Sequence, residues 1–291
     1  MPSALVLRSA LLLLVASLLG GCAGTPAATT PTSGLGRIAQ SHVLTVGYRE
    51  DARPFSFRGS DGAPAGYSIE LCKRVAVSLR AQLKLETLDI KWVPVTVATR
   101  MQAVTDGTVD FECGTTSRTL GREKVVDFSN PTWVDLASFV SPASAPLRSL
   151  PELHGRRVGV VPGTTNETAL KALADRGIVP VLVPMKTHTE GIAALREGRI
   201  DAYATDRLIL VGEVMGGPAG ANLVLSDDYL SVETYGLVMR RDAELRLAVN
   251  RALAEIYRSG EIATVFRQVF GAGSVPSPIL EAAYMINALP E

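Results

Sequence analysis

The sequence predicts an α/β protein of two lobes joined by two chain crossings, the construction of a hinged clamshell. Three observations support this fold class. Short apolar runs alternate with segments of helical spacing, which is typical of largely parallel sheets covered by helices. A helix-to-strand turn recurs in similar form about midway along the chain. The chain has 291 residues, and this length allows two separate cores.

Residues 1–22 have the form of an export signal. Arg8 precedes an apolar run over residues 11–19, and small residues and Cys22 follow it. The run is shorter than the roughly 20 residues that a membrane-spanning helix needs. The string over residues 19–22 also resembles a bacterial lipobox, in which the cysteine becomes lipidated. Cleavage near this point with Cys22 incidental is the alternative.

Residues 23–40 are rich in Ala, Thr, Pro, Ser and Gly, and this composition predicts a flexible tether. The first part of lobe 1 is expected over residues 41–140. Ser68 is a candidate N-cap for its first helix, because apolar residues recur at helical spacing after it. The expected strands are 43–48, 91–95 and 109–112, and the expected helices are 68–79 and 100–104.

Lobe 2 is expected over residues 141–228. It begins at a Pro- and Ser-containing segment, 141–146, that we interpret as the first crossing. Strand and helix patterns alternate again after this segment. The expected strands are 157–161, 179–183 and 202–204, and the expected helices are 168–175, 190–196 and 208–214.

The return to lobe 1 is expected over residues 229–275, after a second crossing near residues 227–233. It holds one apolar strand and two amphipathic helices, and residues 276–291 form a C-terminal tail. The strand is expected at 235–239 and the helices at 244–259 and 262–270.

The recurring turn covers residues 106–111 and 197–202. Both segments have the order acid, Gly, any residue, aliphatic, Asp, apolar. The glycine suits a left-handed helix end, and the aliphatic residue begins a buried strand. The repeat indicates either coincidence between two ordinary turns or two lobes of similar construction. In the second case, ligands would bind at the carboxyl ends of the strands.

Charge and cysteine content exclude some classes of function. Lys plus Arg equals Asp plus Glu, 29 each, which argues against a nucleic-acid partner. Cys72 and Cys113 lie far apart and lack metal-ligand spacing, so no metal and no cofactor are predicted. In an oxidising compartment the two cysteines form a disulfide or remain buried free thiols.

Polar residues cluster at the predicted strand-to-helix corners, and their chemistry suits a zwitterion. Arg122 can hold a carboxylate through two parallel bonds, and Asp206 can pair with an ammonium. Positive groups in excess of one carboxylate point to a second carboxylate on the ligand. Taken singly, each residue also has a structural explanation, such as a solvated arginine or an N-cap. The candidate ligand contacts are Arg49, Arg100, Thr115, Ser117, Arg122, Thr164, Thr165, His188 and Asp206.

Several strings between about residues 44 and 270 match one family pattern. The strings are 66–72, 106–122, 126–129, 163–167 and 235–240. On these strings the chain resembles a type II periplasmic substrate-binding protein of an ABC importer, in the polar amino-acid group, and is most similar to glutamate/aspartate-binding members. The fold implied is a two-lobed, type II periplasmic-binding-protein-like clamshell with two hinge crossings.

The resemblance implies roles for matching residues. Arg122, with Ser117 and the Thr164–Thr165 corner, would hold the α-carboxylate, and Asp206, with Thr115, would hold the α-ammonium. The side-chain carboxylate would be held by Arg49, Arg100 and His188. The sequence departs from the acidic-ligand members at Val97, where a hydroxyl is usual, and this leaves glutamate versus aspartate open.

The expected function is non-enzymatic capture of glutamate or aspartate by a periplasmic, monomeric protein, tethered if lipidated, that docks on an inner-membrane ABC permease. Three alternatives stay open. The fold could bind another polar amino acid such as glutamine. It could be a dehydratase-type enzyme, with Asp110 or Glu112 as acid or base. It could also be a sensor domain that acts through a separate partner.

Overall fold

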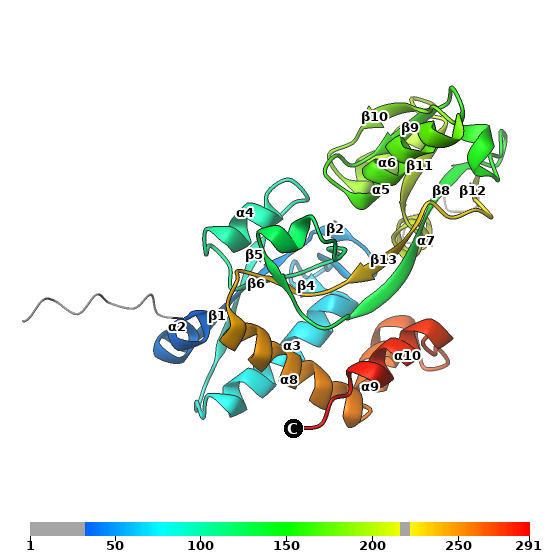
Figure 1. Cartoon of the computed structure of the whole chain (residues 1–291). Helices are drawn as coiled ribbons and strands as arrows, with labels where there is room; N and C mark the ends of the chain where they lie inside the picture. Colours follow the sequence, from blue (N-terminus) through cyan, green and yellow to red (C-terminus); the bar gives the residue numbers. More distant parts are fainter. Residues whose placement is uncertain (1–32, 216–221) are drawn as a thin grey trace, which may run out of the picture. The chain divides into compact units, whose positions relative to one another are not determined.

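The computed structural model describes residues 33–215 and 222–291 (Figure 1). The expected export signal, Cys22 and most of the expected tether lie outside these residues. In the described part of the chain, no helix has the length and apolar character needed to cross a bilayer.

The first sheet has five strands and is built around β1 (Val43–Tyr48). This strand lies between two parallel neighbours, β5 (Asp89–Pro94) and β6 (Phe111–Cys113). Next to β6 lies β14 (Val238–Met239), which runs antiparallel to it and to the edge strand β7 (Asp127–Phe128). The sheet therefore contains one strand that arrives from the far end of the sequence, as the predicted return segment requires.

Helices from both ends of the sequence build the first core. α3 (Tyr67–Gln82) packs against α8 (Ala243–Arg258) and α9 (Glu261–Phe270), and α4 (Arg100–Thr105) packs near β14. Ser68, expected as an N-cap, lies inside α3, and its hydroxyl donates to the Gly114 carbonyl (2.9 Å). The cap position belongs to Gly66 instead, because the chain turns there with a φ of 115°.

A small three-stranded sheet follows β1. Its strands are β2 (Asp51–Ala52), β3 (Ser56–Arg58) and β4 (Pro64–Ala65), all antiparallel. The sequence patterns did not predict these strands, since each is too short to show a period of two. The sheet brings Asp51 against Arg49, which lines the cavity described below.

The second large sheet repeats the construction of the first. Its order is β10 (Val181–Pro184), β9 (Arg157–Val160), β11 (Ala202–Asp206), β8 (Trp133–Pro142) and β12 (Leu223–Leu225). The first three strands are parallel, and β8 runs antiparallel to β11 and β12. Three helices belong to this part: α5 (Thr165–Ala172), α6 (His188–Arg196) and α7 (Arg207–Met215).

The two crossings form a pair of antiparallel strands. β13 (Ser231–Tyr235) pairs with β8 over five residues, from Trp133↔Tyr235 to Ala137↔Ser231. The expected first crossing at 141–146 is wrong, because β8 continues as a sheet strand through Pro142. The second crossing was expected near 227–233 and lies in β13. The expected strand at 235–239 is divided between β13 and β14 and so serves both sheets.

Both ends of the described chain are helical where the sequence predicted none. α2 (Gly34–Ser41) begins inside the expected tether, and its Ile38 is fully buried. α10 (Pro278–Asn287) occupies the expected tail, and the hydroxyl of its Tyr284 lies 2.6 Å from that of Tyr67. These helices are stabilised by distant parts of the chain, so local composition did not reveal them.

The recurring helix-to-strand turn has the same local structure in both places. The glycine of each turn has a positive φ, 77° and 69°. Asp110 then accepts a bond from the backbone N–H of Thr45 in β1 (2.7 Å). Asp201 accepts the matching bond from Arg157 in β9 (2.8 Å). The turns start β6 and β11, which hold equivalent positions in the two sheets, so the repeat reflects shared construction rather than coincidence.

Candidate ligand-binding site

A small cavity lies where elements of the two large sheets meet. Its volume is about 10 Å³, the space of about one water molecule. Eight of the nine residues that the sequence predicted for ligand contact line it, and only Arg122 does not. The lining residues are Arg49, Val97, Arg100, Thr115, Ser117, Thr164, Thr165, Asn166, His188, Thr205, Asp206 and Ile209.

Arg49 follows β1 and is 2% exposed. Its backbone N–H donates to the Ser56 hydroxyl (2.9 Å), and this hydroxyl donates back to the Arg49 carbonyl (3.2 Å). Its Nη2 donates to Asp51 (2.6 Å). Its Nε–H is buried and has no hydrogen-bond partner among the described residues. One side of the guanidinium is therefore held by protein, and a buried donor remains for a ligand.

Arg100 begins α4 and is also buried with an unpartnered Nε–H within the described part of the chain. Burial lowers the pKa of Arg100 to about 9, and the nearby Glu112 carboxylate opposes this shift. Glu112 is fully buried and accepts a bond from the Thr116 hydroxyl (2.9 Å). A Cβ at residue 114 would lie 1.9 Å from Glu112 Oε1, so any larger residue than Gly114 would force the Glu112 carboxylate to move.

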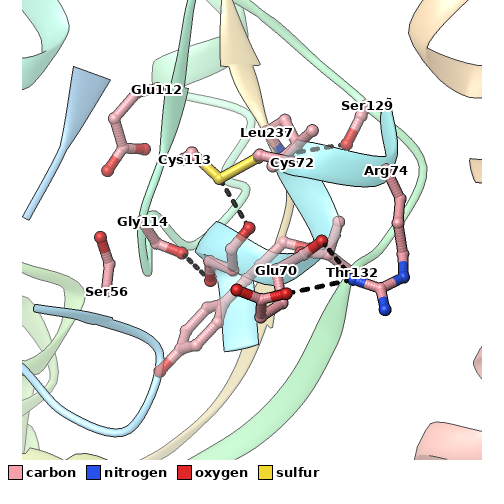
Figure 2. The surroundings of a disulfide bond; sticks show 12 residues. Ser56, Glu70, Cys72, Arg74, Glu112, Cys113, Gly114, Ser129, Thr132 and Leu237 are labelled. Atoms are coloured by element: carbon pink, nitrogen blue, oxygen red, sulfur yellow. Dashed lines mark hydrogen bonds and ion pairs between the residues drawn. A yellow bond between two sulfur atoms is a disulfide. The ribbon is translucent and has the colours of Figure 1, made fainter. Parts of the chain in front are cut away.

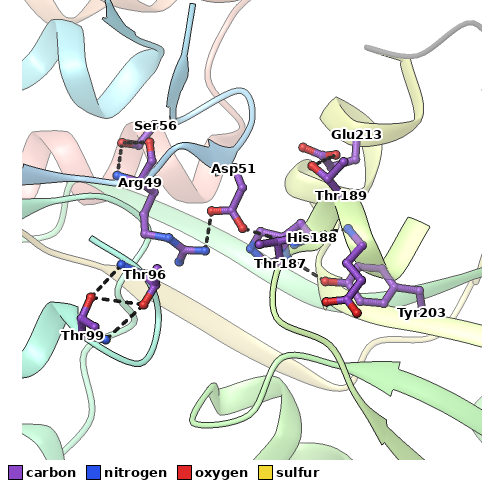
Figure 3. A network of polar contacts seen from close by, with 11 residues as sticks. Arg49, Asp51, Ser56, Thr96, Thr99, Thr187, His188, Thr189, Tyr203 and Glu213 are labelled. Carbon is purple, nitrogen blue, oxygen red and sulfur yellow. Dashed lines mark hydrogen bonds and ion pairs between the residues drawn. The ribbon is translucent and has the colours of Figure 1, made fainter. Parts of the chain in front are cut away.

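His188 is the first residue of α6, whose N-cap Thr187 accepts a bond from Glu190 N. Its Nδ1 lies 2.8 Å from the Tyr203 hydroxyl, and its backbone N–H donates to Asp51 (3.2 Å). Figure 3 shows Asp51 between Arg49 and His188. Burial lowers the pKa of His188 to about 4, although the Asp51 carboxylate acts in the opposite direction. The imidazole is therefore neutral at pH 7 and offers hydrogen bonds rather than charge.

Asp206 ends β11 and accepts bonds from Asn166 Nδ2 (2.8 Å) and the Tyr235 hydroxyl. Burial raises the pKa of Asp206 to about 7, and the nearby carboxylates Glu233 and Asp135 add to this shift. A cation placed beside Asp206 would favour its ionised form. This is the behaviour expected of a group that receives an ammonium.

Arg122 lies beside the cavity rather than in its wall. It donates to the Ser117 carbonyl (2.6 Å) and to the Gly163 carbonyl (3.1 Å), and it lines an adjoining cavity of about 500 Å³ together with Thr164 and Thr165. Ser117 precedes the first crossing and Gly163 follows β9, so this side chain joins the two parts of the site.

Cys72 and Cys113 form a disulfide in the structure, with their Cα atoms 6.5 Å apart (Figure 2). The bond connects α3 to the end of β6, one residue before Gly114. It therefore fixes the strand end from which Thr115 and Ser117 reach the cavity. The sequence left open whether these cysteines form a disulfide or remain free thiols, and the structure contains the disulfide.

Several residues of the site lacked a predicted role. Asn166 and Tyr235 bind Asp206, Tyr203 binds His188, and Asp51 binds Arg49. Asp51 stands in a polar cluster at the end of the first predicted strand, which was a usable signal. The aromatic residues gave no signal, because both read as ordinary buried strand positions.

The two sheets, each with one antiparallel strand, and a polar cavity between them define a solute-binding protein of the type II periplasmic class. The chain belongs to the bacterial extracellular solute-binding proteins, family 3, whose family model matches residues 44–272.

Relatives and solved structures support this assignment. The "L-glutamate/L-aspartate-binding protein" of Pseudomonas aeruginosa is 33% identical over 242 residues, covering 82% of this chain and 80% of that protein. A crystal structure of the P235GK mutant of ArgBP from T. maritima is similar with a TM-score of 0.72 at 25% identity, covering 82% of this chain and all of that one. AncCDT-1, an ancestral amino acid-binding protein described as a precursor of cyclohexadienyl dehydratase, is similar with a TM-score of 0.71 at 26% identity, with coverage of 82% and 100%.

Proposed function

We propose that this protein captures glutamate or aspartate outside the cytoplasm and delivers it to the permease of an ABC importer, without catalysis. The observation that carries the proposal is the pair of buried guanidinium groups at Arg49 and Arg100. Each has a buried Nε–H with no partner among the described residues. A buried donor left unpaired costs about 1–3 kcal/mol, which an anionic ligand would offset.

The remaining contacts suit the α-carbon groups of an amino acid. Asp206, beside Thr115, would hold the ammonium. Arg122 would hold the α-carboxylate with the hydroxyls of Ser117 and Thr165, whose oxygens lie 3.4 Å apart. With Arg49, Arg100 and His188 for a second carboxylate, the site would match a dicarboxylic amino acid at both ends.

Binding requires the two parts of the site to separate and close again. A cavity of about 10 Å³ cannot hold an amino acid. Hydrogen bonds beside it join its two sides, from Arg122 to Gly163 and from His188 to Asp51. A ligand that contacts both sides would favour the closed arrangement through its greater affinity for it. A permease would then distinguish the loaded protein from the empty one.

Val97 lines the cavity and supports one alternative. Its side chain offers no hydrogen bond, so the site has one donor fewer for a side-chain carboxylate than a hydroxyl would give. Another polar amino acid, such as glutamine, is the second candidate ligand.

An enzymatic role has less support. Glu112 is absent from the cavity wall, and Asp110 is engaged by Arg37 and by the backbone of Thr45. Neither carboxylate is in a position to exchange a proton with a ligand. We expect no turnover of prephenate or arogenate, and product formation that depends on Glu112 would contradict this proposal.

Calorimetry on the purified protein tests the ligand. L-glutamate or L-aspartate should bind with 1:1 stoichiometry, and binding of L-glutamine or L-arginine in their place would overturn the acidic-ligand assignment.

Replacing one of the two buried arginines tests whether their guanidinium groups bind the ligand. Arg100→Met should weaken binding of the acidic ligand by about 30-fold or more, because one partner of a buried charge pair is lost. The matched control is Arg199→Met, since Arg199 is half exposed and its one ion pair within the described part of the chain is with Glu197. This control should bind the acidic ligand as the unchanged protein does. An equal loss of affinity in both variants would contradict the role assigned to Arg100.

A further inference from the structure

One carboxylate of the protein contacts two of the three residues assigned above to the ligand's side chain, Arg49 and His188. Asp51 Oδ1 accepts a bond from Arg49 Nη2 (2.6 Å), and Asp51 Oδ2 accepts one from the backbone N–H of His188 (3.2 Å). The two contacts come from different parts of the protein, the segment after β1 and the start of α6. Figure 3 shows this chain of polar contacts continuing from His188 to Tyr203.

Asp51 stands behind these groups, outside the ligand cavity. It lines a separate cavity of about 280 Å³ together with Glu50, Arg53, Arg196 and Glu213 among others. Arg49 and His188 line the ligand cavity and not this one. Asp51 would therefore act on a ligand through Arg49 and α6, as a positioning residue.

The position of Asp51 reduces the positive charge that a ligand meets. It pairs with a guanidinium that is 2% exposed, and it lies at the N-terminus of α6, where the helix dipole is positive. Burial would raise the pKa of Asp51, but Arg49 and His188 outweigh this and keep the pKa below its usual range. The carboxylate is therefore ionised at neutral pH.

This compensation has opposite consequences for the two candidate ligand classes. With Asp51 present, Arg49 keeps a partner when an uncharged side chain enters the cavity. Without it, an amide ligand would leave a buried guanidinium uncompensated, which is costly. An acidic ligand would supply the missing charge itself. The internal carboxylate thus narrows the difference in affinity between an acid and its amide.

We propose that Asp51 sets the selectivity of the site, lowering its preference for acidic amino acids over their uncharged amides by serving as an internal counter-ion for Arg49 and the start of α6. The inference rests on the proposed function and assigns Asp51 a role in the specificity of the same site.

The test is the ratio of the dissociation constants for L-glutamine and L-glutamate, measured by calorimetry. Asp51→Asn keeps the size of the side chain and removes its charge. We expect this variant to raise the ratio about ten-fold or more, since in a medium of effective dielectric constant near 20 a unit charge has a ten-fold effect at about 12 Å and a larger one at shorter range. Asp51→Glu, which restores the charge, should return the ratio toward that of the unchanged protein.

Glu213→Gln is the matched control. Glu213 lines the same cavity as Asp51, is also partly buried, and accepts a bond from the Thr189 hydroxyl in the first turn of α6, where Asp51 accepts bonds from a guanidinium and a backbone N–H. Its loss of charge should leave the ratio within about three-fold, since it bonds to none of the three residues assigned to the ligand's side chain.

Two results would overturn the inference while leaving the proposed function intact. In the first, Asp51→Asn binds L-glutamate and L-glutamine with an unchanged ratio. In the second, Glu213→Gln moves the ratio as far as Asp51→Asn does. If the unchanged protein binds neither glutamate nor aspartate, the proposed function itself fails and the inference fails with it. Circular dichroism of each variant confirms that the fold is kept.

Discussion

At the scale of single residues, the ionisation of Asp206 depends strongly on its surroundings. It is buried, and two further carboxylates lie near it. Together these hold its pKa at about 7, against 3.8 for an ordinary aspartate. The folded protein therefore binds a proton at Asp206 more tightly than the unfolded chain does. This contribution to stability is complete below about pH 4 and is lost as the pH rises through 7.

We predict that Asp206 lowers the stability of the ligand-free protein between about pH 4 and pH 7, while His188, whose pKa is lowered to about 4, acts in the opposite direction up to about pH 6.5. Asp206→Asn removes the first of these groups, so its free energy of unfolding should change over this range in the stabilising direction relative to the unchanged protein, by a few kcal/mol. Urea unfolding at several pH values measures the difference. An identical slope in the two proteins would show that Asp206 has an ordinary pKa.

At the scale of elements, α6 packs against β11 through Gly191 and Tyr203. A Cβ added at Gly191 in α6 would lie 2.1 Å from the ring of Tyr203 in β11. The same ring carries the hydroxyl that bonds to His188 (2.8 Å). The glycine therefore allows the contact that orients a ligand-site residue.

The sign of one substitution tests this close approach. Gly-to-Ala at an exposed helix position stabilises by about 1 kcal/mol. At Gly191 we predict the opposite, a loss of about 1–3 kcal/mol, because the core is overpacked. Chemical denaturation of Gly191→Ala measures the change. Tyr203→Phe is the companion variant. It should lower the free energy of unfolding by less than Gly191→Ala does, because the ring of residue 203 keeps its place. A stabilised Gly191→Ala would refute the packing argument.

The elements that the sequence predicted well are those whose signal is local. The strand expected at residues 43–48 matches β1 at both ends. α2 and α10 were missed, because each is stabilised in part by distant residues: α2 packs against α8, and Tyr284 of α10 contacts Tyr67. In the site, charge and hydroxyl chemistry identified most of the lining. Asp51 was given no role although it stands two residues after Arg49 in a predicted polar cluster, because the contact that links it to His188 spans 137 residues.

At the scale of the whole molecule, the Cys72–Cys113 disulfide closes a loop with a sequence separation of 41 residues. Such a cross-link reduces the entropy of the unfolded chain. We predict that Cys72→Ser/Cys113→Ser lowers the free energy of unfolding by about 4 kcal/mol. Urea unfolding with and without a reducing agent measures this. The reducing agent should destabilise the unchanged protein and have no effect on the double variant. If the agent lowered the free energy of unfolding of both proteins equally, the stabilising role of the disulfide would be contradicted.

The position of β14 also determines when the first sheet can be completed. β14 lies between β6 and β7, and β7 pairs with no other strand of the described chain. The residues that form β14 are Val238 and Met239, which come after all of the second sheet. During synthesis or passage through a membrane, the first sheet must therefore wait for most of the chain to emerge, while the second can form earlier. We expect the two sheets to fold in the reverse of their order in the sequence.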